Sequence, residues 1–293
     1  MRMPGGRLLG LLILLCGLLP AMTEAKERLL WLVRDLPPFT IFEGSEKGQG
    51  VIDRMLPELI AQMPEYDHSI VRVNRARGLQ MLQRPNLTCD PTLLWTPERA
   101  RFVQFSTPFL GVLSSGLVVR RQDQALLAPF LERGKIDLQR LLAQTRLKLG
   151  IVAERSYSAQ VDDILRQLPD SAFSRHYGND ATANLLQMQR LGRLQLVLGY
   201  WPEARYMIQQ QGGSLDEYVF HPIQGVDRYQ FFHVGCSDTP LGREAIGHID
   251  PLLATLRHAP LPEQYAQWLD PDLREDYLEQ SRRFFKDQQD APR

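Results

Sequence analysis

The chain has 293 residues, with 34 basic and 34 acidic side chains and therefore no formal net charge. This length is enough for two domains of ordinary size. The balance of charge argues against a nucleic acid or an anionic membrane surface as the main partner.

The first 25 residues have the pattern of a secretory signal peptide. Two arginines precede an apolar run over residues 8–19, which is too short to span a bilayer as a stable helix. Small residues at Thr23 and Ala25 stand at the two positions that a signal peptidase reads. We expect cleavage after Ala25 and a mature protein that is soluble and periplasmic. Cys16 raises the alternative of a lipoprotein, but Leu15 stands before it where lipidation needs a small residue.

After the signal peptide, strand and helix patterns alternate along most of the chain. Short apolar runs bounded by turn residues are typical of buried strands, and apolar residues with helical spacing indicate helices that pack one face inward. In chain order, we predict strands at 29–35, 69–73, 87–90, 114–121, 147–153, 194–200 and 229–237, and helices at 51–63, 75–83, 137–145, 154–165, 181–192, 202–212 and 241–257, followed by two more helical segments, the last at 271–288. This alternation predicts parallel or mixed sheets covered by helices, with a ligand site at the carboxyl ends of the strands.

The same pattern indicates two α/β units. Residues 26–118 form the first unit, and residues 119–224 form a second unit of the same type. Nothing after residue 240 alternates like a new sheet, so we expect residues 225–293 to complete the first unit. The chain would then cross between the two units twice.

Thr96 and Pro97 form a helix-start signal, because threonine caps free backbone N–H groups and proline suits the first helical position. This start would place Arg99 in the first helical turn, where a cation is unfavourable unless an anion lies nearby. One interpretation supplies that anion from Glu98, Asp90 or another carboxylate of the chain. The other supplies it as the carboxylate of a ligand, which the planar fork of arginine binds through two parallel hydrogen bonds.

Cys89 and Cys236 remain after removal of the signal peptide. Two cysteines in an oxidising compartment favour one disulfide, and two buried free thiols are the alternative. Neither the cysteines nor the six histidines have the spacing of a metal site, so we expect neither a metal nor a cofactor.

Arg75 and Arg77 stand at the start of the helix predicted at 75–83. They could add an anion site, but a solvent-exposed helix face is the interpretation that we prefer.

An ordered set of segments resembles the periplasmic solute-binding proteins that ABC importers use for amino acids. The set spans most of the mature chain and consists of DLPPFTIF, KGQGVIDRMLPEL, TPERARFVQFSTPF, SSGLVV, LKLGIVAERSYS and GRLQLVLGY. The resemblance is greatest to a subgroup of exported proteins with a cysteine just before the TPER segment. It implies an α/β, two-lobe periplasmic binding protein-like fold of type II, in which each lobe is a mixed sheet flanked by helices and the lobes close on a ligand. It also implies a monomer whose partner is an ABC permease or a membrane sensor.

The resemblance assigns roles to residues in both lobes. It places Arg99 where the family binds the carboxylate of the ligand, and Thr96 where the same turn adds hydrogen bonds. Phe39 matches an aromatic position that packs on the ligand, and Asp35 matches a polar contact. The start of a helix in the second lobe completes anion recognition with backbone N–H groups and hydroxyls, at Ser156, Tyr157 and Ser158.

One departure from the family concerns the ammonium group of an amino acid. The family usually places an aspartate after the strand LQLVLG to pair with it, but this chain has Tyr200 followed by Trp201. Trp95, before the TPER segment, also replaces a small or hydroxyl-bearing residue. A buried ammonium without a carboxylate partner loses its hydration, so we expect standard α-amino acids to bind poorly and a carboxylate with an apolar or aromatic body to bind better. Asp35 or Glu154 could still supply the missing charge, and the aromatic pair could instead be core packing.

Two other functions remain open in the sequence. The family fold also hosts periplasmic dehydratases that act on prephenate-like acids, for which Glu154 is the candidate acid or base. The second is a sensor subunit that reports ligand occupancy to a membrane partner, which the sequence does not separate from an importer component.

Overall fold

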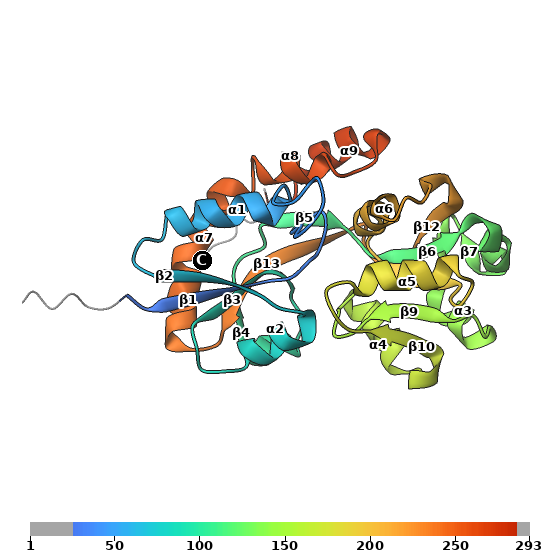
Figure 1. The fold of residues 1–293 in the computed structure, drawn as a ribbon, viewed down its shortest axis with the longest axis horizontal. Helices are drawn as coiled ribbons and strands as arrows, with labels where there is room; N and C mark the ends of the chain where they lie inside the picture. The colour runs from blue at the N-terminus through green and yellow to red at the C-terminus, as the bar shows by residue number, and fades with distance from the viewer. Residues whose placement is uncertain (1–25, 286–293) are drawn as a thin grey trace, which may run out of the picture.

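The protein consists of two lobes that lie side by side along its long axis (Figure 1). The computed structural model describes residues 26–285. The predicted signal peptide, Cys16 and the last residues of the helix predicted at 271–288 lie outside the described residues. Within the described part of the chain, no helix is both long and apolar enough to span a membrane. We call the lobe that contains the first strand lobe 1 and the other one lobe 2.

Lobe 1 is a mixed sheet covered by helices. Its elements are β1 (Arg28–Val33), α1 (Val51–Ala61), β2 (Asp67–Arg72), α2 (Arg75–Leu82), β3 (Thr88–Leu94), η1 (Arg99–Arg101), β4 (Val103–Phe105), β5 (Leu110–Leu113), β13 (Tyr229–Ser237), α7 (Pro240–Leu256), α8 (Leu261–Ala266) and α9 (Pro271–Ser281). The strand order is β2-β1-β3-β13-β4, and β5 also pairs with β13. β1 is parallel to β2 and β3, whereas β13 is antiparallel to β3, β4 and β5.

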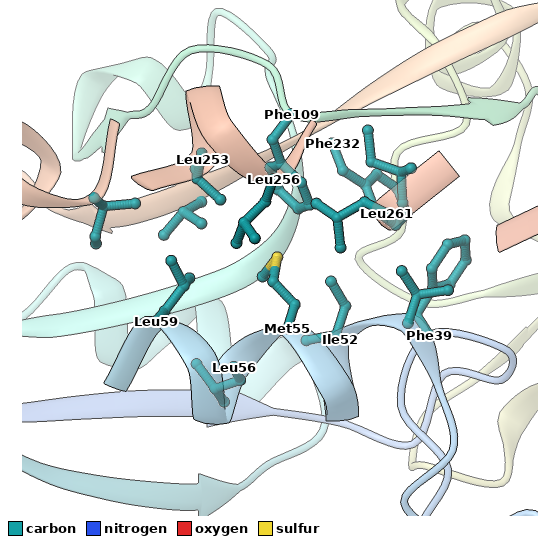
Figure 2. Packing of buried hydrophobic residues seen from close by; sticks show 14 of the residues in the cluster. Phe39, Ile52, Met55, Leu56, Leu59, Phe109, Phe232, Leu253, Leu256 and Leu261 are labelled. Atoms are coloured by element: carbon teal, nitrogen blue, oxygen red, sulfur yellow. The ribbon is translucent and has the colours of Figure 1, made fainter. Parts of the chain in front are cut away.

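Helix α1 packs into the core of lobe 1 because its apolar residues recur on one face. That buried face consists of Val51, Ile52, Met55, Leu56 and Leu59. Figure 2 shows Met55 pointing toward Leu256 of α7, with Phe39 and Phe232 at one end of the same cluster. The C-terminal helix α7 therefore packs into the same core as the N-terminal helix α1.

Lobe 2 is built on a second mixed sheet. Its elements are β6 (Gly116–Arg120), η2 (Arg121–Phe130), β7 (Leu131–Glu132), β8 (Lys135–Ile136), α3 (Leu138–Gln144), β9 (Leu149–Val152), α4 (Ala159–Arg166), η3 (Asp170–Ala172), β10 (Phe173–His176), α5 (Ala181–Arg190), β11 (Leu196–Gly199), α6 (Trp201–Gln210), η4 (Leu215–Glu217) and β12 (Tyr218–Pro222). The strand order is β10-β9-β11-β6-β12, in which β9 is parallel to β10 and β11, and β6 is antiparallel to β11 and β12. β7 and β8 form a separate hairpin.

The chain crosses between the lobes at two places. It leaves lobe 1 between β5 and β6 and returns between β12 and β13. The boundary that we expected at residue 118 lies inside β6, whose partners in the described chain are strands of lobe 2, so the first crossing falls earlier, at residues 114–115. At this crossing, Ser115 Oγ donates a hydrogen bond to the carbonyl oxygen of Tyr157 at 2.9 Å.

The helix expected to start at Thr96 and Pro97 is not formed. The segment makes a single turn of 3-10 helix, η1, before β4 begins at Val103. Thr96 Oγ1 accepts a hydrogen bond from the backbone N–H of Arg99 at 3.2 Å. A turn this short aligns few peptide dipoles. The expectation that a helix dipole disfavours the charge of Arg99 is therefore wrong, and the chemistry of Arg99 follows from its burial instead.

Helix α9 connects lobe 1 to lobe 2. Its charged residues are mostly exposed, as the sequence indicates, but Tyr277 is buried and its hydroxyl donates to the carbonyl oxygen of Gly111 at 2.7 Å. Asp270, at the start of α9, accepts a hydrogen bond from Trp201 Nε1 at 2.9 Å and pairs with Arg205 Nη1 at 2.7 Å. Both of these partners belong to α6, toward which α9 extends in Figure 1.

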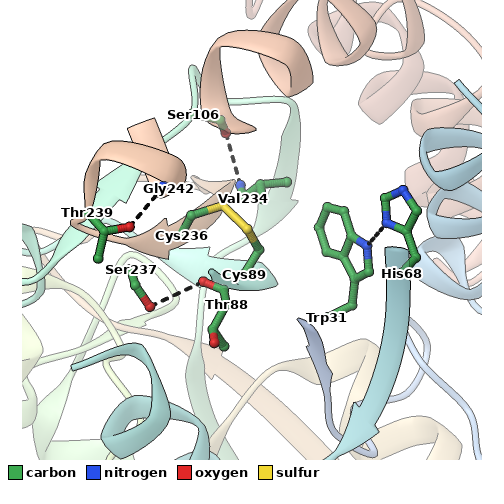
Figure 3. Close-up of a disulfide and its surroundings, with 10 residues drawn as sticks. All are labelled: Trp31, His68, Thr88, Cys89, Ser106, Val234, Cys236, Ser237, Thr239 and Gly242. Carbon is green, nitrogen blue, oxygen red and sulfur yellow. Dashed lines mark hydrogen bonds between the residues drawn. A yellow bond between two sulfur atoms is a disulfide. The ribbon is translucent and has the colours of Figure 1, made fainter. Parts of the chain in front are cut away.

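Cys89 of β3 and Cys236 of β13 form a disulfide, which confirms the prediction (Figure 3). The two residues are opposite each other in the antiparallel pair, with Cα atoms 4.0 Å apart, and both are wholly buried. Because β3 and β13 are neighbours in one sheet, the disulfide joins two strands of lobe 1 and does not connect the lobes.

Candidate ligand-binding site

Arg99 lies buried between the two lobes, with 7% of the residue exposed. Its Nη1 donates to the carbonyl oxygen of Leu94 in lobe 1 at 3.0 Å. Its Nη2 donates to the carbonyl oxygen of Glu154 in lobe 2 at 3.2 Å. The guanidinium therefore contacts both lobes, and both contacts are to neutral groups.

The carboxylates that could have neutralised Arg99 do not pair with it. Asp90 is engaged by Arg34, and Glu98 is exposed. Among residues 26–285, no carboxylate forms an ion pair with Arg99. Burial lowers the pKa of Arg99, and the charge of Arg34 lowers it further, while Asp90 and Asp162 oppose this effect. The charge of Arg99 is thus only partly compensated by the protein.

Two cavities meet at Arg99. The larger, of about 380 Å³, has walls from both lobes, including Thr96 of lobe 1 and Ser156 of lobe 2. The smaller, of about 10 Å³, has room for about one water molecule. Residues that line the smaller cavity include Arg75, Thr92, Arg99, Arg155, Ser156 and Tyr200. The lobes therefore lie close together in this structure.

Arg155 and Glu203 form a bidentate ion pair in the lobe 2 wall of the site. Arg155 Nη1 lies 2.6 Å from Glu203 Oε2, and Nη2 lies 3.0 Å from Oε1. The hydroxyl of Thr182 donates to the same Oε1 at 2.7 Å. Burial disfavours the charge of Arg155, but Glu203 overcomes it and raises the pKa of Arg155 above its ordinary value. Both carboxylate oxygens of Glu203 are therefore occupied by the ion pair with Arg155.

Arg34 and Asp90 form the corresponding pair in lobe 1. Arg34 directly follows β1 and Asp90 lies in β3, and both side chains are almost fully buried. Arg34 Nη2 donates to Asp90 Oδ1 at 3.2 Å and to the carbonyl oxygen of Thr92 at 2.9 Å. Burial alone would raise the pKa of Asp90, but the charge and hydrogen bonds of Arg34 hold it below its ordinary value.

Arg75 does not lie on the solvent-exposed face that we preferred for it, whereas Arg77 does. The side chain of Arg75 lines the smaller cavity together with Arg99 and Arg155. Its Nε is enclosed and has no hydrogen-bond partner among the described residues. Burial lowers the pKa of Arg75 well below its ordinary value, and the like charges of Arg34, Arg155 and Arg99 add to this effect.

The loop between β9 and α4 forms the lobe 2 side of the larger cavity. Glu154 has a φ angle of 58°, in a region that residues other than glycine rarely adopt, and its carbonyl oxygen faces lobe 1. The carboxylate of Asp162 holds the loop by accepting hydrogen bonds from the hydroxyl of Ser156 and from the backbone N–H of Tyr157 at 2.9 Å. Ser158 Oγ caps the first turn of α4.

Some of the predicted site residues meet at Arg99. Thr96, Ser156 and Tyr157 line the larger cavity, and Tyr200 lines the smaller one. The Tyr200 hydroxyl donates to Gln230 Oε1 at 3.2 Å, and burial raises the pKa of Tyr200 to about 12. Tyr200 is therefore a neutral hydrogen-bonding group in the wall of the site.

Other predicted site residues lie away from Arg99. Phe39 packs behind Phe232 in the core of lobe 1, with ring centroids 4.7 Å apart. Trp95 is 55% exposed. Trp201 stacks on Phe220 and lines a different cavity, of about 340 Å³, near the crossings between the lobes. The structure does not gather these three aromatic residues around Arg99.

Asp35 is half-buried in the loop after β1. Its Oδ1 accepts a hydrogen bond from the backbone N–H of Phe42 at 3.3 Å, and no described basic side chain forms an ion pair with it. Burial raises the pKa of Asp35, and repulsion by Glu203 adds to the increase. No group of three or more His, Cys, Asp or Glu side chains in the described range is arranged to hold a metal ion.

Arg34, Arg155 and Glu203 were not predicted as site residues from the sequence. Each follows a strand closely, at the edge of a sheet where ligands bind in α/β proteins, and this position is the signal that could have identified them. Arg34 and Asp90 are 56 positions apart, and Arg155 and Glu203 are 48 apart. Only the tertiary structure shows which of these charges are paired.

Comparisons with known proteins identify the fold. No family model and no curated protein sequence matches the chain. A histidine kinase sensor domain with similarity to periplasmic binding proteins matches with a TM-score of 0.61 and 14% identity, over 83% of this chain and 96% of that chain. An ancestral amino acid-binding protein, described as a precursor of cyclohexadienyl dehydratase, matches with a TM-score of 0.60 and 14% identity, over 84% of this chain and 95% of that chain.

A third solved structure is a Salmonella typhimurium periplasmic binding protein with high arginine specificity. It matches with a TM-score of 0.57 and 14% identity, over 83% of this chain and 97% of that chain. These alignments cover both lobes, and they agree with the mixed sheets and flanking helices described above. The protein therefore has the two-lobe α/β fold of the periplasmic binding proteins.

Proposed function

We propose that the protein is a periplasmic solute-binding protein that holds a small carboxylate-bearing ligand between its lobes. The observation that carries the proposal is Arg99, a buried guanidinium that contacts both lobes but has only neutral carbonyl partners. A buried cation is costly unless it is paired, and a carboxylate offers the planar guanidinium two parallel hydrogen bonds. A ligand carboxylate would supply the charge that the described residues do not.

The arrangement of acidic groups supports ligands other than standard α-amino acids. An ammonium group near Arg99 would need a free carboxylate. Glu203 is already paired with Arg155, and Asp162 is already bonded to the loop before α4. Tyr200 offers only a neutral hydroxyl. Cation–π contact alone recovers about 0.5–2 kcal/mol, which is less than a charged partner would give.

The fold also supports a role beside a membrane partner. The expected signal peptide would export the chain, and a binding protein of this fold would deliver its ligand to an ABC permease or report it to a membrane sensor. Reconstitution with each class of partner, with ligand uptake and signalling as separate readouts, would distinguish the two roles.

A dehydratase is less well supported by the geometry. Glu154, the candidate acid or base, has an exposed side chain at the rim of the larger cavity. No described residue forms a hydrogen bond or ion pair with its carboxylate, whereas efficient proton transfer needs an oriented group. We therefore propose binding without catalysis, and an assay of prephenate consumption by the purified protein should show no turnover.

The test of the binding proposal is Arg99→Lys, measured with a thermal-shift screen of carboxylates followed by calorimetry. Lysine keeps the charge but cannot form two parallel bonds to a carboxylate, so we expect affinity to fall by about tenfold or more. The matched control is Arg101→Lys, because Arg101 lies in the same turn and is exposed. Equal affinity in Arg99→Lys and the wild type would show that Arg99 is a structural residue and would contradict the proposal.

A further inference from the structure

The site contains more buried positive charge than one carboxylate needs. Arg75 is repelled by the charges of Arg34, Arg155 and Arg99, and Arg99 is also repelled by the charge of Arg34. Three of these four arginines line the smaller cavity, and Arg99 and Arg155 also line the larger one. Like charges this close in a buried region repel strongly, because the protein interior screens them less than water does.

Two of the four arginines are neutralised within the protein. Arg34 is paired with Asp90, and Arg155 is paired with Glu203 through two short contacts. In both pairs the side chains of both partners are at most 5% exposed, so each pair is a closed unit. Neither pair leaves a carboxylate over for a neighbouring arginine.

Arg75 and Arg99 are the two that remain without a carboxylate. Arg99 has only backbone carbonyl partners. The side chain of Arg75 has no hydrogen bond and no ion pair with any residue in the described part of the chain, and its Nε is enclosed. Asp90 raises the pKa of Arg75, but Arg34 already holds this carboxylate. Two uncompensated guanidinium groups thus face the same region between the lobes.

Resting on the proposed function, we propose that the ligand carries two anionic groups, one held by Arg99 and the other by Arg75. A dicarboxylate is the simplest such ligand. A dicarboxylate would match the two unpaired guanidinium groups in number, whereas a monocarboxylate would leave half-buried Arg75 without an anionic partner. Thr92, Ser156 and Tyr200 line the same cavity and provide neutral hydrogen-bonding groups around the charges.

The test compares two matched ligand series on the mature protein. Malonate, succinate and glutarate carry two carboxylates, and propionate, butyrate and valerate carry one carboxylate on a chain of the same length. We expect at least one dicarboxylate to raise Tm more than its monocarboxylate counterpart and to bind about tenfold or more tightly. Arg75→Gln should remove this preference, because the dicarboxylate then loses its second cationic partner. The control Arg77→Gln, at the exposed neighbour on the same helix, should keep the preference.

The outcomes separate this inference from the proposed function. Binding of monocarboxylates as tight as that of dicarboxylates, with no effect of Arg75→Gln, overturns the inference but leaves a carboxylate site at Arg99. A panel in which neither series raises Tm contradicts both. If dicarboxylates bind and Arg99→Lys has no effect, the proposed role of Arg99 is wrong.

A second measurement needs no ligand. If Arg75 is uncompensated, removing its charge by Arg75→Gln should raise the Tm of the ligand-free protein, whereas Arg77→Gln should leave it unchanged. A lower Tm in Arg75→Gln would mean that the protein itself satisfies Arg75, and this result would overturn the inference.

Discussion

Arg155 and Glu203 show how strongly a single residue can control the charge of the site. The side chains of this ion pair are 5% and 3% exposed, and its carboxylate also accepts a hydrogen bond from Thr182. If one partner is removed, the other remains as a buried charge that water cannot reach. The pair should therefore matter more for stability than the pairs on the surface do.

We predict that Glu203→Gln lowers the free energy of unfolding by about 3–5 kcal/mol, because it leaves Arg155 buried without its carboxylate. Urea unfolding followed by circular dichroism measures the change. Asp163→Asn is the control, since Asp163 pairs with Arg166 on the surface with more than half of each side chain exposed. A similar loss in both variants would mean that Arg155 and Glu203 are not a special buried pair.

Two histidines whose pKa values are lowered in the folded protein predict a dependence of stability on pH. Burial lowers the pKa of His233, whose Nδ1 lies 2.7 Å from the carbonyl oxygen of Ser106, and burial also lowers the pKa of His221. A histidine whose pKa is lower in the folded state than in the unfolded state makes its full contribution to the free energy of unfolding above about pH 6.5. As pH falls below this value, that contribution is lost, because the unfolded chain binds more protons than the folded protein does.

We therefore expect the free energy of unfolding to fall between about pH 7 and pH 5, before most carboxylates take up protons. The double variant His221→Gln/His233→Gln should show a smaller slope over this range in urea titrations. An unchanged slope would assign the pH dependence to other groups.

At the scale of elements, the disulfide fixes the pairing of β3 with β13. We predict that the double variant Cys89→Ala/Cys236→Ala is less stable than the oxidised protein by roughly 2–4 kcal/mol. Chemical denaturation with and without a reductant measures the difference. The wild type under reducing conditions should approach the variant, and equal stability in all samples would contradict a structural role for the bond.

The sequence was sufficient to predict the long elements. Helical spacing of apolar residues identified α1, and uninterrupted apolar runs identified strands such as β11. The shortest strands were missed, because three residues such as Val103–Phe105 show no periodicity and are held by pairing with β13. Thr96 accepts a hydrogen bond from a backbone N–H group, as the sequence signal at Thr96 and Pro97 predicted. The α-helix that the same signal predicted does not form, since the chain turns directly into β4.

The site could be predicted only in part, for a related reason. Arg99 was proposed as a site residue from its place in a recognisable segment, and the structure places it between the lobes. Arg75 was misjudged because the start of a helix does not tell which of two nearby arginines faces inward, and here Arg75 does while Arg77 does not. The charge balance of the site depends on pairs that are distant in the sequence, such as Arg155 with Glu203.

At the scale of the whole molecule, the narrow space at Arg99 bears on ligand entry. A cavity of about 10 Å³ does not admit a ligand, so the lobes have to separate before one can reach both Arg75 and Arg99. Contacts of α6 with Asp270, through Trp201 and Arg205, hold the lobes together away from the site. A ligand favours the closed arrangement only if it contacts both lobes.

We predict that a bound ligand closes the lobes. Because the free protein has to open to admit a ligand, small-angle scattering should give a smaller radius of gyration at saturation with the tightest-binding carboxylate than without it. Asp270→Asn should enlarge the radius of the free protein, because it weakens the pairing with Arg205. An unchanged radius on saturation would contradict closure by the ligand.

The positions of the two cysteines in the chain also bear on how the protein matures. Cys89 precedes the whole of lobe 2, and Cys236 follows it. In the exported protein that the sequence predicts, the second cysteine follows all of lobe 2, so the bond can form only after the whole of lobe 2 has been exported. For the same reason, a protease that cuts any loop of lobe 2 leaves two fragments that stay covalently joined, and that separate on a gel only after reduction.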